Sequence, residues 1–449
     1  MLPPGPRGTV AQQTLAWLIR PGAFMTRCRE RYGDTFSVKL LNEGTFVFTS
    51  DPEQVRSIFT GDPDVLHGGE AKDVLGAVLG PSSLLRLDGE RHLRQRRLIT
   101  PAFHGERMHA YLDLMTEVIR RDVATWPQGR PFRLYEHMQS ITLDIILRAL
   151  FGLGAGEDRR LAELRSALLG LLDWVTQPRL LFLLVLAGPE RAKRWSAFRR
   201  TQERVHRMLT EEIHRRRANE TPGHDVLSAL VHARDEHGDA LADDELRDEL
   251  MTLLLAGHET TAGSLAWAFE RLVRNPEVLE RATDAARDSD GEYLEAVAKE
   301  TLRLRSVTPV LVRRLTRPMQ LGEWTLPAGV HVAPCSFLLH RREDLYPDPL
   351  SFRPERWVGT KPGTYTWLPF GGGTRRCPGA AFGLQEMRVT LETVLRHVSL
   401  RAADQAPERI GRRLLFLTPA RGATVIADRV DRFEKVRSPE VLAIRGARG

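Results

Sequence analysis

The sequence predicts a mainly α-helical (α+β) protein, in which a large helical part carries a small mixed β-sheet region. Apolar residues recur at helical spacing through most of residues 88–305. Strand-like alternation is confined to two short stretches, near residues 35–49 and 310–335. Because isolated strand pairs are rarely stable, we expect these distant stretches to pair in one sheet beside the helices.

The first strand-like stretch contains a turn signal and is followed by the signal of a helix start. A turn is expected around Asn42–Gly44, where turn-forming residues interrupt the alternation. A helix is expected to follow, capped by Ser50 or Asp51, with Pro52 in its first turn. This part of the chain is therefore predicted to form two strands followed by a helix.

No internal repeat or low-complexity linker divides the chain, which favours one continuous fold. We expect a single domain over residues 1–449. Its expected parts are a β-rich part at about 30–65 and 308–340, a helical part at about 66–305 and 377–400, and a loose, charged tail at about 428–449.

Composition and charge exclude some classes of protein. Hydrophobic residues make up 42% of the 449 residues and charged residues 27%, as in ordinary folded proteins. The net charge is +7, but the 58 acidic residues are interspersed among the 65 basic ones. Since no nucleic-acid motif is present, we expect no nucleic-acid partner and favour an acidic protein partner.

The cysteines indicate a reducing compartment. Cys28, Cys335 and Cys377 are odd in number and far apart, which argues against a disulfide framework and against a zinc site of paired CxxC motifs. A cytoplasmic location is the natural interpretation. No apolar run approaches the roughly 20 residues that a spanning helix needs, so no transmembrane anchor is expected.

Cys377 precedes a predicted helix. Apolar residues follow it at helical spacing, and Pro378 suits the first helical position. Unpaired N–H groups and the helix dipole would lower the pKa of the thiol, which would make the sulfur a metal ligand or a nucleophile. An inert, buried cysteine is the alternative.

The glycines before Cys377 favour a ligand site. Gly371–Gly373 lack Cβ atoms, so a flat, bulky group could approach the backbone closely. A phosphate-binding loop is rejected, because no Gly-Lys-Ser/Thr sequence follows. A nucleophilic cysteine with a histidine partner stays open, since the chain has 14 histidines, but it would leave the glycines unexplained.

The haem-binding signature of cytochrome P450, FxxGxRxCxG, resembles the motif formed here by Phe370, Gly373, Arg375, Cys377 and Gly379. The resemblance implies that Cys377 is the axial thiolate on the iron of haem b (iron protoporphyrin IX). It implies that Arg375 pairs with a haem propionate, and that Phe370, Gly371 and Gly379 lie at the cofactor. It covers nearly the whole chain and implies the fold of the soluble bacterial members, with haem between a long central helix and the helix after the cysteine.

That central helix is expected over residues 246–274, closed by Asn275-Pro276. His258-Glu259 begins like the HExxH motif of zinc proteases, but Ala262 stands where the second histidine would be, so a zinc site is rejected. Thr260 bonding back to the Ala256 carbonyl, and merely bending the helix, is the structural alternative.

The segment "AGHETT" is similar to the oxygen-binding motif of the same family. The similarity implies that Ala256 and Gly257 line the cofactor. It also implies that Thr260 and Glu259 are catalytic and organise proton delivery, which the reduction of dioxygen requires. A buried glutamate beside hydroxyls is costly without such a role or partners.

Further family positions lie outside these two motifs. Glu300 and Arg303 are neighbours on one helix face. With Arg356, the resemblance implies a structural triad that locks this helix to the segment before the cysteine loop. The implied propionate ligands are His92, Arg96 and Arg313, with Arg314 a close competitor. Ser306 departs from the family, which usually has proline there.

Matching positions also imply a substrate pocket, lined by Leu79, Leu253, Val310, Leu311, Phe416 and Leu417. Because these side chains are apolar, we expect a small hydrophobic substrate such as a fatty acid, terpenoid, steroid or polyketide-like molecule.

The implied activity is that of a haem-dependent monooxygenase that inserts one atom of O2, the co-substrate, into that substrate. No reductase domain is evident in 449 residues, so electrons from NAD(P)H are expected only indirectly, through a ferredoxin or flavodoxin and its reductase. We expect a monomer. A haem-thiolate gas-sensing protein would not need the proton relay, and a peroxide-using or isomerase variant usually lacks the acid-alcohol pair, so Glu259 and Thr260 favour the monooxygenase.

Overall fold

The computed structural model describes residues 1–71, 76–103, 107–152, 159–176, 196–219, 223, 225–413 and 415–430. Most of the predicted loose tail, residues 431–449, lies outside the described residues. Residues 428–430 were also assigned to that tail. They instead form the end of a strand, β12, because they pair with β9.

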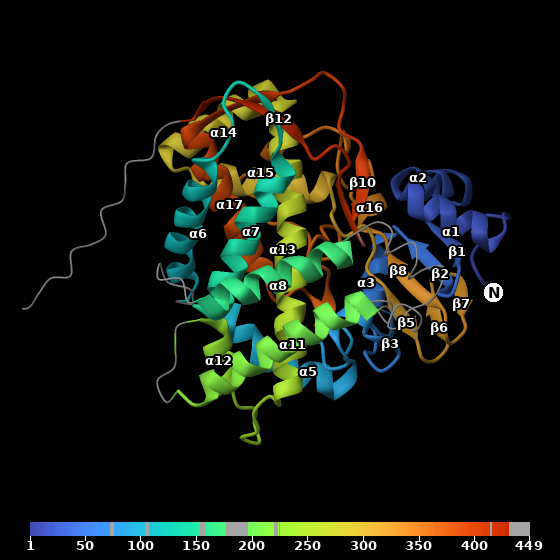
Figure 1. Ribbon diagram of the computed structural model, residues 1–449. Helices are drawn as coiled ribbons and strands as arrows, with labels where there is room; N and C mark the ends of the chain where they lie inside the picture. The colour runs from blue at the N-terminus through green and yellow to red at the C-terminus, as the bar shows by residue number, and fades with distance from the viewer. Residues whose placement is uncertain are drawn as a thin grey trace, which may run out of the picture.

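Helices make up most of the described chain (Figure 1). They are α1 (Val10–Ile19), α2 (Pro21–Tyr32), α3 (Pro52–Thr60), α4 (Gly76–Leu79), α5 (Gly89–Ile99), α6 (Arg107–Val123), α7 (Leu134–Phe151), α8 (Arg159–Thr176), α11 (Ser196–Arg217), α12 (Val226–His232), α13 (Asp243–Val273), α14 (Pro276–Asp288), α15 (Gly291–Leu304), α16 (Ser336–Leu339) and α17 (Ala380–His397), with short 3-10 turns at η2 (Thr100–Phe103), η3 (Pro354–Trp357) and η4 (Gly373–Arg375).

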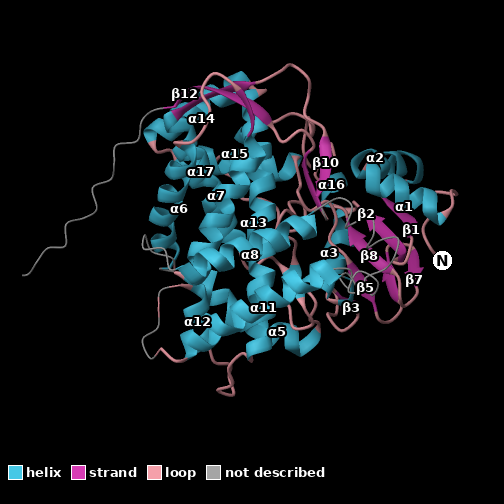
Figure 2. Ribbon diagram, viewed as in Figure 1, coloured by secondary structure: helices cyan, strands magenta, loops and turns pink. Residues whose placement is uncertain are grey.

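The strands are short and gather at one side and at one end of the helical part (Figure 2). They are β1 (Thr35–Leu40), β2 (Gly44–Thr49), β3 (Leu66–His67), β4 (Pro131–Arg133), β5 (Arg313–Leu315), β6 (Met319–Leu321), β7 (Trp324–Leu326), β8 (His331–Pro334), β9 (Val398–Ala402), β10 (Ile410–Arg413), β11 (Phe416–Pro419) and β12 (Thr424–Val430).

The main sheet joins the two predicted β stretches. Its strand order is β1-β2-β8-β5-β3, with β2 and β8 parallel and the other pairs antiparallel. The prediction of one mixed sheet is thus confirmed. Asn42 and Gly44, at the predicted turn, have positive φ angles, and Asp51 caps α3 by accepting from Gln54 N–H.

Two further sheets were missed by the sequence analysis. The order β4-β12-β9 brings residues 131–133 beside the end of the described chain, and β10-β11 forms a hairpin. These strands are short, with three residues in β4, four in β10 and four in β11, so their signal in the sequence is weak. The hairpin matters for function, because β11 packs on α13.

The central helix α13 crosses the helical part next to α7 (Figure 1). It begins with three acidic residues, which complement the positive end of its dipole, and ends just before Asn275-Pro276, as predicted. Buried residues occur around its whole circumference because α7, α11, α15, α17 and β11 surround it.

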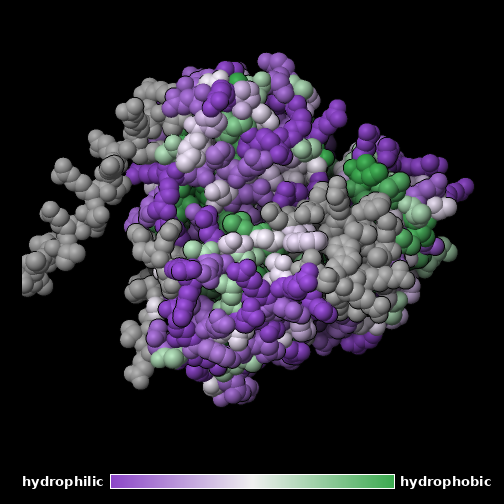
Figure 3. Space-filling view, in the orientation of Figure 1, coloured by the Kyte–Doolittle hydropathy of each residue, from purple (hydrophilic) through white to green (hydrophobic). Residues whose placement is uncertain are grey.

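The largest hydrophobic cluster lies between these helices, and smaller clusters lie against the main sheet. The outer surface in Figure 3 is mostly hydrophilic, and green residues gather over the N-terminal helices α1 and α2. Leu15 and Ile19 of α1 are exposed. The core therefore encloses the central helix and places the motifs that follow.

Candidate active site

Cys377 ends a tight loop. Its backbone N–H donates to the Phe370 carbonyl at 2.8 Å, and the N–H of Gly371 donates to the Leu368 carbonyl at 3.1 Å. Gly371 and Gly373 have φ angles of 68° and 64°, which residues with a Cβ rarely adopt. The glycines therefore allow the loop to fold back on itself.

The glycines have a second role that differs from the predicted one. An added Cβ at Gly372 would lie 3.0 Å from the Phe59 ring, and one at Gly373 would overlap the Phe59 carbonyl oxygen. Only Gly371 has room, with Leu311 as the nearest side chain at 3.8 Å. Gly372 and Gly373 are therefore required by their packing on the end of α3, and Gly371 is the glycine of the three with space beside it.

The Cys377 thiol is strongly desolvated yet accessible. Helix α17 begins at Ala380 with Gly379 as its N-cap, so Pro378 is not its first residue. Burial raises the pKa of Cys377, whereas the Gly379 N–H and the charges of Arg96 and Arg376 lower it. The predicted lowering is therefore wrong for the polypeptide alone, because desolvation outweighs the helix terminus. Cys377 nevertheless remains exposed.

Arg375 lies almost fully buried beside this loop. It donates to the Leu87 carbonyl and to Asp88 Oδ1, the latter at 2.5 Å. Asp88 also accepts from the backbone N–H groups of Gly68 and Gly69. The guanidinium is thus anchored where α5 begins.

Arg313 and Arg314 differ sharply in environment. Arg313 is 8% exposed, and among the described residues no carboxylate lies within 4.0 Å of its side-chain nitrogens. Its guanidinium donates to the carbonyl of Val312 at 3.0 Å, and burial lowers its pKa to about 10, with Arg375 contributing repulsion. Arg314 points to the other side of β5 and pairs with Glu70 at 3.4 Å.

Helix α5 brings His92 and Arg96 to one side, one turn apart. His92 is buried, and Arg96 is half-buried near enough to Cys377 for the two charges to interact. Arg94 points elsewhere and pairs with Asp235 at 2.5 Å. The structure thus gathers Arg96, Arg313 and Arg375 around the cysteine loop, while Arg94 is neutralised away from it.

Thr260 has the back-bonded geometry of a helix-bending threonine. Its hydroxyl donates to the Ala256 carbonyl at 2.6 Å. Ala256, Gly257 and Thr260 are only half-buried at the centre of an otherwise buried helix. Because the hydroxyl proton is used within the helix, the Thr260 oxygen is left as an acceptor.

Glu259 is buried and held from three directions. Its carboxylate accepts from Tyr135 Oη at 2.7 Å and Gln139 Nε2 at 2.9 Å, both on α7, and from Arg413 Nη2 of β10 at 3.5 Å. Burial and the Glu259 charge raise the pKa of Tyr135. Sequence reasoning missed Tyr135, Gln139 and Arg413, which lie more than 100 residues from Glu259 and belong to no recognisable motif.

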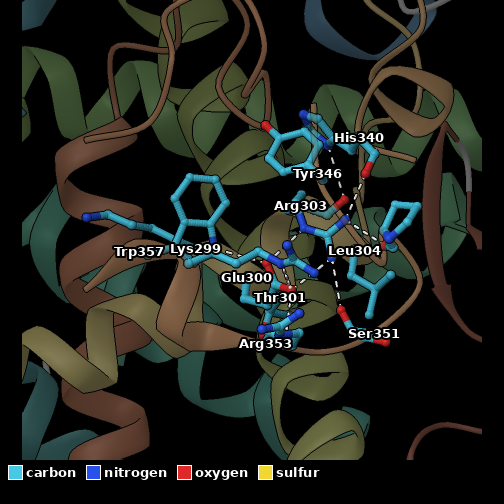
Figure 4. Close-up of polar contacts among 12 residues, drawn as sticks. Lys299, Glu300, Thr301, Arg303, Leu304, His340, Tyr346, Ser351, Arg353 and Trp357 are labelled. Carbon is cyan, nitrogen blue, oxygen red and sulfur yellow. Dashed lines mark hydrogen bonds and ion pairs between the residues drawn. The ribbon is translucent and has the colours of Figure 1, made fainter. Parts of the chain in front are cut away.

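The three residues of the predicted structural triad lie together, and Figure 4 shows Glu300 and Arg303 with their polar contacts. Glu300 and Arg303 are fully buried and form a bidentate pair, with both N to O distances 2.8 Å. Arg356 Nε lies 3.4 Å from Glu300 Oε1, and Trp357 Nε1 donates to the same carboxylate at 3.0 Å. Arg303 also donates to the His340 carbonyl at 2.7 Å. These contacts fasten α15 to η3 and to the segment after α16.

A protein-family model described as "Cytochrome P450" matches residues 3–427. The chain belongs to the cytochrome P450 family. Cytochrome P450 135B1 of Mycobacterium tuberculosis (strain ATCC 25618 / H37Rv) is 41% identical to this P450 over 437 residues, which cover 94% of this chain and 91% of that protein. Cytochrome P450 137 of the same strain is 37% identical, with 94% and 90% covered.

Solved structures share the fold of this P450. The retinoic acid-bound cyanobacterial CYP120A1 superposes with a TM-score of 0.81 at 22% identity, covering 96% of this chain and 99% of that one. The cytochrome P450DA heme domain superposes with a TM-score of 0.82 at 24% identity, covering 96% and 98%. The predicted fold class is confirmed.

As a member of this family, the protein is a haem-thiolate monooxygenase. It uses haem b and O2, with reducing equivalents that come from NAD(P)H through redox partners, and it acts on a small-molecule substrate. The predicted family, enzyme class and cofactors are thereby confirmed.

The residues present fit haem b. An exposed cysteine whose thiol is desolvated by the surrounding protein suits an iron ligand, and among the described residues no cluster of three His, Cys, Asp or Glu competes for a metal ion. A buried Arg313 without a carboxylate partner suits an anionic propionate. Arg96 and Arg375 lie near enough to add positive charge.

Ser306 has a contact that the proline usual in this P450 family cannot make. Its Oγ lies 3.0 Å from His340 Nδ1 and 3.2 Å from the Leu302 carbonyl. His340 is fully buried, and its Nε2 accepts from the backbone N–H of Leu368 at 2.9 Å. Burial lowers the pKa of His340 to about 3. A neutral serine–histidine bridge therefore joins the end of α15 to the start of the cysteine loop.

The predicted pocket residues of this P450 approach from two sides. Leu79 and Leu253 belong to the large helical core, whereas Val310 and Leu417 belong to a cluster beside the main sheet. Leu311 packs with Phe59 and Leu368, and Phe416 begins β11. Helix α13 and β11 are in contact, which brings the two sides together.

Among the residues that the structure describes, each helix of this P450 is too short or too polar to cross a lipid bilayer.

Proposed function

We propose that this P450 inserts one atom of O2 into a hydrophobic organic substrate, such as a fatty acid, terpenoid, steroid or polyketide-like molecule. The supporting observation is the apolar character of the predicted lining, in which Leu79, Leu253 and Leu417 are buried. Retinoic acid, which is bound to a protein of the same fold, belongs to this apolar class and serves as one probe.

In the proposed arrangement, Cys377 holds the iron and His92, Arg96, Arg313 and Arg375 hold the propionates. Bound haem supplies the iron that activates O2. Phe370, Gly371, Gly379, Ala256 and Gly257 form the remaining contacts. Arg313 is preferred to Arg314, because its charge is buried without a carboxylate whereas Arg314 is already paired.

Glu259 and Thr260 are proposed to deliver protons. The Glu259 carboxylate is buried and connected through Arg413, which is partly exposed, to the surface. The Thr260 oxygen, with its own proton committed to Ala256, can accept a hydrogen bond from a proton donor in the site. In this proposal Glu259 supplies the carboxylate, and Thr260 supplies an acceptor oxygen that orients the proton donor in the site.

The electrons are proposed to come from a ferredoxin or flavodoxin and its reductase. We further propose a single-domain monomer in the cytoplasm. Cys28 and Cys335 are buried free thiols whose pKa burial raises to about 11 and about 12, and such thiols are stable in a reducing compartment.

The test is a ligand screen on the haem-loaded protein. Fatty acids, terpenoids, steroids and retinoic acid are titrated while the Soret band is followed, and hits are incubated with NAD(P)H, O2 and a ferredoxin or flavodoxin system. Apolar ligands should shift the band and yield oxygenated product only when O2 and the redox system are present. Band shifts with charged, polar compounds alone would overturn the substrate class, and a ligand recovered unaltered would overturn turnover.

A further inference from the structure

A small cavity lies where α13, the end of α15, α16 and the β10-β11 hairpin meet. Figure 1 shows α16 beside β10 at this junction. The cavity has a volume of about 10 Å³, which is room for roughly one water-sized particle. Two arginines, Arg305 and Arg341, line it together with Trp267, Phe337, Ser306 and Leu417. It shares Leu417 with the predicted substrate pocket and Ser306 with the serine–histidine bridge, but its two arginines belong to neither.

Arg305 brings an unused hydrogen-bond donor to this cavity. Its Nε is buried and has no hydrogen-bond partner among the described residues, although the residue as a whole is only half-buried. Its guanidinium lies over the ring of Trp267, 4.7 Å from the centroid, but a contact with a ring face takes up no N–H group. The Nε–H group has therefore lost its hydration without a replacement acceptor.

Arg341 adds a second cation, and each of its two Nη atoms has one hydrogen-bond acceptor. It donates to the Phe337 and Leu304 carbonyls at 2.7 Å and 2.6 Å, and lies over the Phe337 ring. Burial and, after it, the neighbouring charges of Arg305 and Arg303 lower the pKa of Arg341 to about 9. Burial likewise lowers the pKa of Arg305 to about 10.

No carboxylate in the described part of the chain balances these two charges at close range. Glu270 and Glu408 are the acidic residues whose charges act on Arg305, and both already bind other groups. Glu270 binds Arg271 and Arg274, at 2.5 Å and 2.7 Å. Glu408 accepts from the backbone N–H groups of residues 409, 421 and 423. The cavity therefore has an excess of positive charge.

We propose that this cavity binds one inorganic anion of about chloride size between the guanidinium groups of Arg305 and Arg341. An anion there would accept the unused Nε–H of Arg305 and offset the repulsion between the arginines. Phosphate and sulfate are too large for the space. The anion would join the ends of α15 and α16 to β11, whose Leu417 N–H donates to Val307 at 2.8 Å.

The experiment uses haem-loaded full-length protein. Its melting temperature is measured while sodium chloride replaces sodium methanesulfonate at constant ionic strength, so that screening stays fixed. The melting temperature should rise with chloride and then follow the logarithmic dependence of a single site. Arg305→Gln and Arg341→Gln should each remove this dependence. Arg317→Gln, which changes an exposed arginine, should keep it. Equal melting temperatures in both salts would overturn the proposal.

A second measurement does not depend on the stability of the variants. Crystals of the unaltered protein are grown or soaked in sodium bromide, and anomalous scattering is recorded at the bromine edge. The expected result is a peak between the guanidinium groups of Arg305 and Arg341. Ordinary water density at that place, with no anomalous signal, would overturn the proposal even if a variant failed to fold.

Discussion

The hydroxyl of Tyr135 donates to the buried carboxylate of Glu259 across 2.7 Å. The contact ties α7 to the centre of α13 and turns the carboxylate toward α7. Thr260, the next residue, donates to the Ala256 carbonyl of its own helix instead. The two residues proposed to deliver protons therefore have separate partners, and each can be altered on its own.

Replacing Tyr135 with phenylalanine should destabilise the protein by about 1–3 kcal/mol, because a buried carboxylate loses a donor that water cannot replace. Urea denaturation of the haem-loaded protein measures the effect. Tyr293→Phe is the matched control, since its hydroxyl donates to Glu355, whose side chain is 45% exposed. An equal loss of stability in both variants would contradict the idea that burial of the Glu259 carboxylate makes its hydrogen bond more important.

Thr260→Ala should keep consuming NAD(P)H but divert most of it to hydrogen peroxide, with roughly a tenfold or larger loss of oxygenated product, a modest value for a lost proton-transfer group. Product, peroxide and NAD(P)H are quantified together. Ser264→Ala is the control, because Ser264 makes the same kind of back-bond one turn later, to the Thr260 carbonyl. Full coupling in Thr260→Ala would remove Thr260 from the proposed relay.

Arg303→Leu should destabilise the protein by about 3–5 kcal/mol, because it leaves the Glu300 carboxylate buried without its charge partner. Arg287→Leu breaks a pair of the same i,i+3 spacing, with Asp284, that is more than half exposed. That control should cost less than about 1 kcal/mol. Thermal denaturation measures the stability of both variants. Similar losses of stability would show that the buried ion pair contributes no more than the exposed one.

Arg313→Gln should release haem faster than the unaltered protein, whereas Arg314→Gln should not. The expected difference follows from burial: Arg313 lacks a carboxylate partner, and Arg314 already has Glu70. Transfer of haem to an excess of apomyoglobin measures the rate. Faster loss from Arg314→Gln alone would reverse the proposed assignment.

His340 should make stability depend on pH. Its pKa is about 3 in the folded protein, against about 6.5 when unfolded, so the unfolded chain binds the extra proton between these values. Its contribution is intact above about pH 6.5 and is lost as pH falls toward 3, by up to about 1.4 kcal/mol per pH unit.

His340→Gln tests this dependence, because glutamine can still accept from the Leu368 N–H but does not titrate. Denaturation curves between pH 4 and 8 should show a shallower slope for the variant. Ser306→Ala serves as the comparison, since it removes the Ser306 contact but keeps the titrating ring. Unchanged slopes in His340→Gln would assign the acid sensitivity to other groups.

Much of the fold was predictable because its signals are local. Helical periodicity, the acidic start of α13 and Asn275-Pro276 after it are set by neighbours in the chain. The strands β9 to β12 were not predicted from the sequence, because short strands form only when distant segments supply their partners. The mixed main sheet was predictable, because both of its stretches carry alternation.

The cysteine loop was predictable in position but not in environment. The spacing around Cys377 identified the family, yet the pKa of its thiol depends on how deeply the fold buries it. Gly373 illustrates the same limit, since the reason it must be glycine is the Phe59 carbonyl, which lies over 300 residues earlier.

The sequence by itself determined the family and the central helix, and it predicted the ligand cysteine and the acid-alcohol pair, because each depends on adjacent or regularly spaced residues. Only the tertiary structure decided which groups hold the buried Glu259. Tyr135, Gln139 and Arg413 come from elements 124, 120 and 154 residues away. A buried carboxylate must be satisfied by whatever donors packing brings to it, and packing is a property of the whole chain.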